Sequence, residues 1–185
     1  LESDEAIYSQ FLDLQFRPAE NLYSTLGLRR DDHTTAGAYN TGRITMAYKL
    51  DGNSKIRSSY GTGLRYPTLY DYFYGTTVSK KEDLAPEKSK SFDIGFEKNF
   101  VDYGLSLDLT YFNIEYENVL EGWKNNNSSG AAYTTQNSDG VVKSQGLEFT
   151  SSWKALQNLD FGLNYTYTST YDGAEADDPN RNQSY

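Results

Sequence analysis

The most regular feature of the sequence is an alternation of apolar and polar side chains with a period of two residues. The pattern recurs eight times between clusters of Gly, Asn, Asp, Ser and Pro, and helical spacing never persists. Side chains of a β-strand point alternately to its two faces, so each segment predicts a strand with one apolar face. The predicted strands cover residues 5–17, 21–30, 41–50, 55–65, 90–98, 103–116, 142–153 and 159–170.

The separation of apolar from polar side chains is complete in some of these segments. Phe92 and Phe96 share one face of residues 90–98, whereas Asp93 and Glu97 share the other. A strand of this kind fits between an apolar medium on one side and water or polar groups on the other. The pattern therefore predicts an all-β chain whose strands have two chemically different faces.

The lengths of the predicted connections alternate as regularly as the side chains do. Short connections cover residues 18–20, 51–54, 99–102 and 154–158. Long connections cover residues 31–40, 66–89, 117–141 and 171–185. In an antiparallel up-and-down meander, every tight turn then lies at one rim and every long loop at the other. Outer-membrane β-barrels typically have this asymmetry.

Aromatic side chains gather near both predicted rims. Those near the short turns are Phe16, Tyr48, Phe100, Tyr103 and Trp153. Those near the long loops are Tyr60, Tyr111, Tyr165, Tyr167 and Tyr171. Amphipathic rings are enriched where lipid headgroups meet hydrocarbon, so we interpret the two groups as girdles of a membrane barrel. A general preference of Tyr for strands does not explain why Leu and Ile give way to Tyr toward both rims.

Composition narrows the class of protein further. The 185 residues include 17 Tyr and 9 Phe, with a formal net charge of −9 and a mean hydropathy of −0.74. No stretch approaches the roughly 18–20 uninterrupted apolar residues of a membrane helix, so a helical membrane protein is excluded. The low hydropathy is compatible with a barrel, because only alternate side chains face lipid. The acidic balance without a basic cluster argues against nucleic acid as a partner.

Four short segments resemble a known family. Residues 60–71 read Tyr-Gly-Thr-Gly-Leu-Arg-Tyr-Pro-Thr-Leu-Tyr-Asp, and residues 84–89 read Leu-Ala-Pro-Glu-Lys-Ser. This pair resembles TonB-dependent receptors, in which a strand ending in Gly, Arg, Pro and Leu is followed by a loop that closes on Leu-x-Pro-Glu-x-Ser. Residues 111–114 and 146–148, which read Tyr-Phe-Asn-Ile and Gly-Leu-Glu, are similar to later strands of that family. The resemblance covers nearly the whole chain from Arg43 onward.

The resemblance implies a large transmembrane β-barrel in the bacterial outer membrane, filled by an N-terminal plug domain and energised through TonB. It also implies a scarce nutrient as ligand, such as cobalamin or a ferric siderophore, and the pattern looks closest to cobalamin receptors. The plug, the TonB-contacting segment and the closing strand are not recognisable in the sequence. We therefore expect residues 1–185 to be a fragment of a single barrel domain, with outer-membrane lipid, nutrient, TonB and plug as partners.

Two sets of residues are candidates for functional contacts. The ligand-binding candidates are Tyr66, Tyr70, Tyr72, Tyr74, Trp123, Asn125 and Lys143. The lumen-facing candidates are Arg57, Arg65, Asp93, Glu97 and Glu148. Loop aromatics beside amides suit a bulky organic ligand with polar edges, and a lysine suits an anionic group. The same rings could instead pack the loops against one another, and the lumen charges could simply balance each other.

Some residues in the segments that resemble this family also have a purely structural interpretation. Gly61 and Gly63 remove bulk where a plug or a neighbouring strand approaches closely. Pro67 lacks an amide hydrogen and therefore suits the place where a strand ladder ends. Together with Arg65, these residues are expected to shape the junction between strand and loop rather than to contact ligand.

The sequence contains no recognisable group of catalytic or metal-ligating residues. His33 is the only His and there is no Cys, so neither a transition-metal site nor a disulfide is expected. We interpret His33 as a solvated residue of a polar loop. Asp31 and Asp32 could ligate Ca²⁺ through oxygen, but they match no organised calcium loop. The sequence thus predicts no enzyme, no cofactor, no metal site and no helix.

Two other interpretations remain open at this point. One is a soluble all-β binding or adhesion protein, whose apolar faces would pack on a second sheet. The other is a self-contained eight-stranded outer-membrane barrel, because eight strands can close a small barrel. The chain ends in what reads as a long loop, so we expect a fragment of a larger barrel instead.

Overall fold

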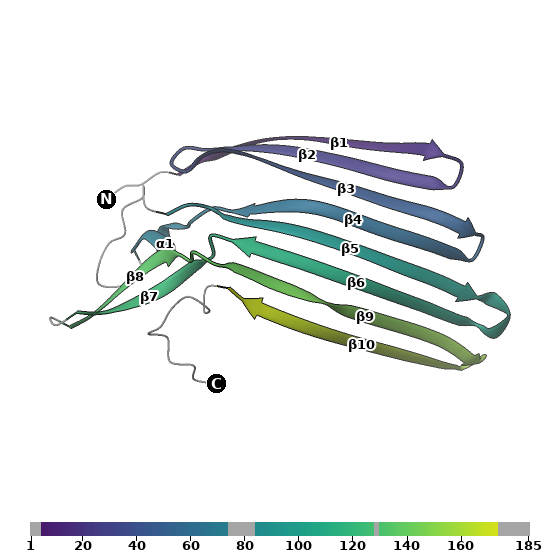
Figure 1. Cartoon of the computed structure of the whole chain (residues 1–185). Helices are drawn as coiled ribbons and strands as arrows, with labels where there is room; N and C mark the ends of the chain where they lie inside the picture. The colour runs from purple at the N-terminus through teal and green to yellow at the C-terminus, as the bar shows by residue number, and fades with distance from the viewer. Residues whose placement is uncertain (1–4, 74–83, 128–129, 174–185) are drawn as a thin grey trace.

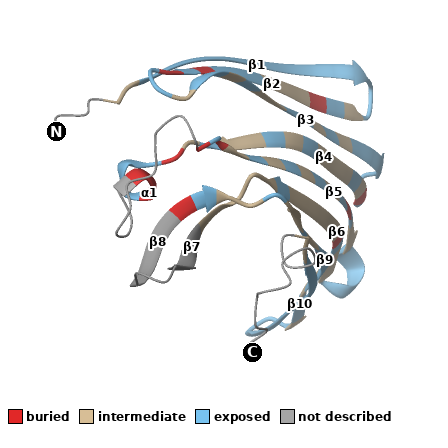
Figure 2. Cartoon of the chain, turned by 60° about the vertical axis from the view of Figure 1, so that its left-hand side comes forward, coloured by how far each residue is buried: buried red, intermediate tan, exposed pale blue. Residues whose placement is uncertain are grey.

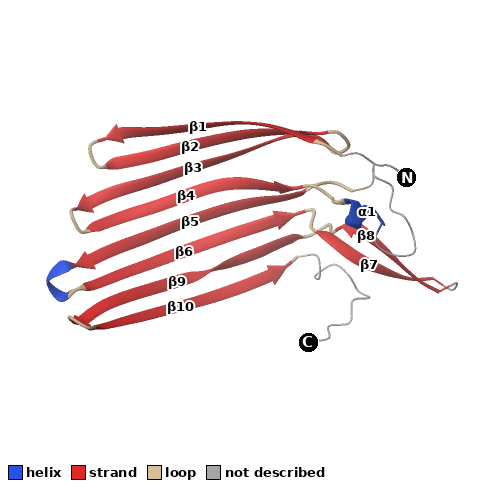
Figure 3. Ribbon diagram, turned by 180° about the vertical axis from the view of Figure 1, so that it is seen from behind, coloured by secondary structure: helices blue, strands red, loops and turns tan. Residues whose placement is uncertain are grey.

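Almost every segment of the computed structural model is a β-strand (Figure 1), and the structure describes residues 5–73, 84–127 and 130–173. The strands of the large sheet are β1 (Ile7–Ala19), β2 (Leu22–His33), β3 (Gly37–Asp51), β4 (Ser54–Arg65), β5 (Glu87–Phe100), β6 (Leu105–Glu117), β9 (Val141–Leu156) and β10 (Leu159–Asp172). A separate hairpin consists of β7 (Leu120–Asn127) and β8 (Gly130–Asn137). Two short helices, α1 (Leu69–Phe73) and η2 (Val101–Tyr103), interrupt the strands of the described part (Figure 3).

The eight long strands form one antiparallel sheet in the order β1-β2-β3-β4-β5-β6-β9-β10. Each strand pairs with its neighbour in the chain, except that β6 pairs with β9 and leaves the β7–β8 hairpin outside the sheet. The predicted all-β, up-and-down meander is therefore confirmed. The sheet is not closed, because β1 and β10 each pair on one side only among the described strands.

The sheet is curved into a trough, as Figure 2 shows. A cavity of about 960 Å³ is lined by residues of β1 to β6 and of β9, among them Gln15, Arg57, Asp93 and Glu148. One cavity can contact strands so far apart in the sheet only from the hollow side. Arg57, Asp93 and Glu148 therefore mark the concave face, and their neighbours along each strand face outward.

The register of the ladders shows that the two faces remain distinct across the whole sheet. Directly opposed residues of neighbouring strands share a face. We call a set of such residues, one from each strand across the sheet, a register row. One row of the concave face contains Gln15, Thr25, Thr45, Ser59, Asp93, Phe112, Gly146 and Thr168. One row of the convex face contains Leu14, Leu26, Ile44, Tyr60, Phe92, Asn113, Gln145 and Ser169. The concave row is mostly polar, and the convex row changes from aliphatic to aromatic to amide.

The strands slide progressively along one another from β1 to β10. Ala19 and Leu22 form the last pair before the β1–β2 turn, and the row that contains them ends at Tyr165 in β10. Tyr165 lies well inside its ladder, which continues to the pair of Leu159 with Leu156. A register row is therefore oblique to the rims, as in a barrel whose strands tilt. This obliquity explains why one convex row passes through several kinds of side chain.

The predicted long loop over residues 31–40 is wrong. β2 continues to His33 and β3 begins at Gly37, so a tight turn joins them. Nδ1 of His33 accepts hydrogen bonds from the backbone N–H groups of Thr35 and Ala36, both at 3.1 Å. His33 is only 4% exposed, so its interpretation as a solvated loop residue is also wrong. The imidazole therefore closes the turn through these two hydrogen bonds, and it is shielded from solvent.

The expectation that the chain contains no helix is wrong as well. α1 is held by a capping box, in which the backbone N–H of Thr68 donates to Oδ2 of Asp71 at 2.7 Å. The backbone N–H of Asp71 donates in return to Oγ1 of Thr68 at 3.4 Å. None of the helices in the described residues is long and apolar enough to cross a membrane. The predicted loop over residues 117–141 also contains structure, namely the β7–β8 hairpin.

Candidate functional site

The concave face carries a chain of hydrogen-bonded polar groups that crosses three strands. Nη2 of Arg57 on β4 donates to Oδ1 of Asp108 at 2.8 Å and to Oγ1 of Thr110 at 2.7 Å, both on β6. The guanidinium reaches them by passing over Gly95 of β5, where an added Cβ would lie 3.0 Å from Cζ of Arg57. A glycine at this position is therefore what allows the bond between non-adjacent strands.

Two other carboxylates of the concave face, on β5, have partners on β4. The Ser59 hydroxyl donates a short hydrogen bond to Asp93, and Nζ of Lys55 lies 2.9 Å from Oε2 of Glu97. The side chains of Lys55 and Glu97 remain 39% and 30% exposed, so water screens this pair. The expectation that Arg57 and Arg65 balance Asp93 and Glu97 is wrong in its pairing, because Arg57 contacts Asp108 and Arg65 contacts Glu87 and Asp71 instead.

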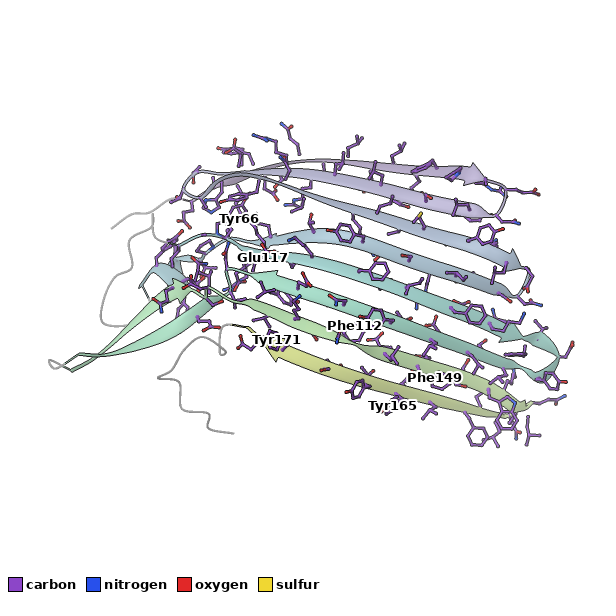
Figure 4. The ribbon with its side chains drawn as sticks, viewed as in Figure 1. Tyr66, Phe112, Glu117, Phe149, Tyr165 and Tyr171 are labelled. Atoms are coloured by element: carbon purple, nitrogen blue, oxygen red, sulfur yellow. The ribbon has the colours of Figure 1, made fainter. Side chains whose placement is uncertain are left out.

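An aromatic side chain also lies on the concave face, beside these charges. Phe112 of β6 is the register partner of Gly146 of β9, and both lie on the polar side. An added Cβ at Gly146 would be 2.8 Å from Cζ of Phe112 and would collide with the carbonyl oxygen of Tyr167. Figure 4 places Phe112 midway along the trough. The cavity is thus lined by both charged and apolar groups, which suits a bulky occupant with polar edges.

The residues of the family resemblance meet at the long-loop rim. Nη1 of Arg65 lies 2.7 Å from Oε2 of Glu87, and Nη2 lies 3.4 Å from Oδ2 of Asp71. Pro67 and Pro86 are fully buried there. The guanidinium thus ties the end of β4 to the start of β5 and to α1. This arrangement gives these residues a structural role at the junction.

The β7–β8 hairpin is attached to this rim by side chains that the sequence analysis missed. Oδ1 of Asn137 accepts from the backbone N–H of Ala85 at 2.7 Å, and Nδ2 donates to the carbonyls of Ala85 and Asn118, both at 2.8 Å. Oε1 of Glu87 accepts from the backbone N–H of Leu120 at 2.8 Å. The hairpin base is therefore fixed to the long-loop rim, from which the hairpin projects beyond the sheet (Figure 1).

A gap in the sheet opens between β3 and β4 at the same rim. Their ladder ends at the pair of Arg43 with Gly61, although β3 continues along β2 to Gly37 and β4 continues along β5 to Arg65. The Thr62 hydroxyl accepts the backbone N–H of Gly42 at 3.0 Å, where the next backbone pair would stand. Beyond this point the two strands diverge.

Tyr66 bridges this gap. Its ring stacks on His33 of β2 with centroids 4.5 Å apart, and meets the ring of Tyr39 edge-on at 5.9 Å. Its hydroxyl lies 3.5 Å from the carbonyl oxygen of Asp31. Burial raises the pKa of the Tyr66 phenol, and the charge of Asp31 raises it further. The phenol therefore stays protonated at neutral pH and can act as a donor.

The remaining ligand-binding candidates are dispersed. Tyr70 is 68% exposed on α1, whereas Tyr72 of the same helix is 1% exposed. Tyr74 lies outside the described residues, and Trp123 and Asn125 lie on β7, where side chains are outside the description. Lys143 lies on the convex face, with Nζ 2.9 Å from Oε1 of Glu115.

Potential metal ligands do not gather in the part of the chain that the structure describes. No group of three or more His, Asp or Glu side chains is placed there to hold an ion. Asp31, a calcium candidate, instead accepts from Nε of Arg29 at 2.9 Å and from the hydroxyl of Ser9.

Comparisons with known proteins agree with the architecture. Residues 2–185 match the family model described as TonB dependent receptor-like, beta-barrel. The vitamin B12 transporter BtuB of Photobacterium profundum is 26% identical over 78% of this chain, which spans 23% of that protein. The chain thus spans about a quarter of the length of this curated relative.

Solved structures show the same fold. The siderophore receptor PirA from Pseudomonas aeruginosa superposes with a TM-score of 0.77 at 21% identity, covering 91% of this chain and 32% of PirA. A variant of the ferric enterobactin receptor PfeA from the same organism has a TM-score of 0.75 at 22% identity, covering 89% of this chain and 26% of PfeA.

Proposed function

The chain belongs to the TonB-dependent receptor β-barrel family, and from this premise we propose that it forms part of the wall of an outer-membrane receptor that imports a scarce nutrient. The family is one of receptors and transporters, not of enzymes. In this proposal residues 1–185 are a fragment of a single barrel domain, and further strands of the whole protein complete the barrel between β1 and β10.

The observation that carries the proposal is the different chemistry of the two faces. Convex side chains such as Leu12, Leu163 and Phe161 are 64%, 59% and 53% exposed in a sheet with no layer over them among the described residues. A soluble protein would bury such a surface against a second sheet. In lipid the same surface is stable, while the strand ladders satisfy the backbone groups that hydrocarbon cannot.

The concave face is the proposed lumen wall. Arg57, Arg65, Asp93, Glu97 and Glu148 belong to this face by register, and their register partners are polar or small except for Phe112 beside Asp93. A wet, charged surface suits a plug domain and the passage of a polar cargo. We propose that the whole protein contains such a plug and draws energy through TonB.

The proposed cargo is a bulky organometallic or iron-chelate nutrient, such as cobalamin or a ferric siderophore. Support comes from the mixed charged and aromatic lining of the cavity, from exposed Tyr70 at the mouth, and from the named ligands of the relatives. Tyr66, Tyr72, Tyr74, Trp123 and Asn125 are proposed to line or shape the same mouth.

Uptake in cells tests this function. The whole protein should restore accumulation of labelled cobalamin or of a ferric siderophore in an outer-membrane receptor mutant, and should fail to do so when TonB is deleted. Accumulation of neither cargo, or accumulation that does not depend on TonB, would defeat the proposal.

A further inference from the structure

His33 is a buried titratable group that the proposed function does not use. It is 4% exposed and is the only His of the 185 residues. Its Nδ1 accepts hydrogen bonds from the backbone N–H groups of Thr35 and Ala36, both at 3.1 Å. An imidazole nitrogen accepts a hydrogen bond only while it carries no proton. The turn between β2 and β3 is therefore closed by a nitrogen that must stay unprotonated.

The turn between β3 and β4 is closed in the same way by a group of different chemistry. Oδ1 of Asp51 accepts the backbone N–H of Asn53 at 2.7 Å, and Oδ2 accepts the Ser54 hydroxyl at 2.9 Å. The bond from Asn53, followed by the bond from Ser54, holds the pKa of Asp51 below its ordinary value. This carboxylate therefore keeps both bonds in mild acid. Imidazole, in contrast, is the side chain that ordinarily changes charge between about pH 5 and 8.

The turn closed by His33 is coupled to the gap between β3 and β4 through Tyr66. The Tyr66 ring stacks on the imidazole with centroids 4.5 Å apart, and meets Tyr39 of β3 edge-on at 5.9 Å. The β3–β4 ladder ends at Arg43 and Gly61, so these ring contacts join the two strands beyond it. Figure 4 places Tyr66 at the long-loop end of the sheet. Movement of the imidazole out of the turn therefore removes one side of the clamp across the gap.

We propose that His33 is a proton-sensitive latch at the long-loop rim, which holds the turn and the Tyr66 clamp closed when neutral and releases both when protonated. The neutral ring carries its hydrogen on Nε2, so a second proton goes to Nδ1 and turns the acceptor of two backbone bonds into a donor. The open turn exposes the imidazolium to water. The open form therefore binds the proton more tightly, and its population increases as the pH falls. The latch does not depend on which nutrient is carried.

The charges around the latch act in opposite directions, since carboxylates favour an imidazolium and cations oppose it. Among the described contacts, only Nδ1 of His33 accepts from the N–H groups of Thr35 and Ala36. The geometry of the turn, rather than the surrounding charge, therefore makes it sensitive to a proton. The titratable or charged groups around His33 and its stacking partner are Glu5 before β1, Arg29, Asp31 and Asp32 of β2, Tyr39 of β3, Tyr66 after β4, and Lys88 of β5.

Spin labelling of the whole protein in lipid tests the latch, once any Cys outside these residues is replaced by Ser. A nitroxide on Thr35→Cys reports the order of the β2–β3 turn. A nitroxide on Gly52→Cys reports the β3–β4 turn, where nothing lies within 4 Å of the Cβ position. Between about pH 7.5 and about pH 5.0, the mobile fraction of the label at residue 35 should rise roughly twofold or more. The label at residue 52 should not change.

His33→Asn separates the latch from other effects of acid. The Asn side-chain oxygen can accept the N–H of residue 35, as in an Asx turn, and an amide does not titrate. In this variant the label at residue 35 should stay equally ordered at both pH values. The parent alone remains informative if the variant fails to assemble, because the two labelled turns differ in the group that closes them. An equal response at residues 35 and 52, or a response that persists in His33→Asn, would overturn the proposal.

A pair of nitroxides on Asn40→Cys and Leu64→Cys measures the gap, because these residues would be partners if the ladder continued past Arg43 and Gly61. The dipolar broadening between the two labels should weaken in the parent at about pH 5.0 relative to about pH 7.5. Tyr66→Phe keeps the ring and should behave as the parent does, whereas Tyr66→Ala should show a wide gap at both pH values. Opening of the turn with an unchanged gap would contradict the clamp. Nutrient uptake is measured separately, so either idea can fail without the other.

Discussion

At the scale of single residues, two glycines let larger side chains cross the concave face. Gly95 leaves space for the guanidinium of Arg57, and Gly146 leaves space for the ring of Phe112. Both positions therefore determine which polar and aromatic groups line the cavity.

Replacing Gly146 with Ala should destabilise the protein. The added methyl group would collide with the Tyr167 carbonyl and the Phe112 ring, at a cost of about 1–3 kcal/mol in the free energy of unfolding. Gly162→Ala is the matched control, because nothing lies within 4 Å of its Cβ position. Urea unfolding from lipid vesicles measures both, and equal effects would contradict the packing described for Phe112.

The bond between Arg57 and Asp108 is expected to contribute modestly to stability. Their side chains are 38% and 26% exposed, so water screens the pair and we expect a coupling of about 1 kcal/mol. A double-mutant cycle with Arg57→Ala and Asp108→Ala measures this coupling free energy. A coupling of zero would show that the charges act independently.

At the scale of elements, the weakest part of the sheet is the gap between β3 and β4. The ladder stops at Arg43 and Gly61, and the aromatic stack of Tyr66 on His33 takes its place. Stacked rings hold the strands together with less directional strength than a backbone ladder.

Tyr66→Ala should therefore increase amide exchange in residues 38–42 and 62–65. The variant removes the stack on His33 and the edge contact with Tyr39, so both strand ends lose their bridge. Tyr66→Phe keeps the ring and should leave exchange nearly unchanged. Hydrogen exchange followed by mass spectrometry compares these variants with Tyr70→Ala, an exposed neighbour on α1. Equal protection in Tyr66→Ala and in the parent would rule out the bridging role.

The strands could be predicted from the sequence because their signal is local. Alternation along residues 90–98 and 159–170 is a property of each segment alone, and the structure extends these strands by only a few residues. The same alternation predicts which residues share a face, so the common face of Arg57, Asp93 and Glu148 could also be predicted.

The rim could not be predicted in this way, because its structure depends on contacts between distant segments. The turn after β2 is tight because His33 binds two backbone N–H groups, yet an isolated His in a polar run looks like loop. α1 is too short to show helical periodicity. Asn137 binds Ala85 across a large separation in sequence, and nothing local distinguishes it from other loop amides. The Thr68–Asp71 spacing of a capping box was the one available signal.

At the scale of the whole molecule, the polarity of the convex face varies with depth. A single register row runs from Leu14 through Tyr60 to Gln145, because staggered strands carry it from the middle of the apolar band to the rim. A membrane explains this gradient, since hydrocarbon, interface and headgroups each favour a different kind of side chain.

A charge placed in the apolar band should impair assembly, whereas the same charge one residue away should not. Leu163→Arg puts a guanidinium on the convex face, at a cost of about 2–4 kcal/mol if the position lies near the bilayer midplane. Asn164→Arg puts it on the concave face and serves as the control. Gel electrophoresis of unheated samples separates folded from unfolded protein, and the folded fraction measures assembly. Equal yields of the two variants would place Leu163 outside hydrocarbon.

The most direct measurement concerns β10, whose residues alternate between the apolar convex face and the polar concave face from Leu159 to Thr168. The 185 residues contain no Cys, so single cysteines at residues 159–168 can each carry a nitroxide in the whole protein reconstituted in lipid, once any Cys outside these residues is replaced by Ser. Accessibility to oxygen should peak at Leu159, Phe161, Leu163, Tyr165 and Tyr167, and accessibility to a water-soluble nickel complex at the residues between them. Uniform or reversed accessibility would contradict the assignment of the convex face to lipid.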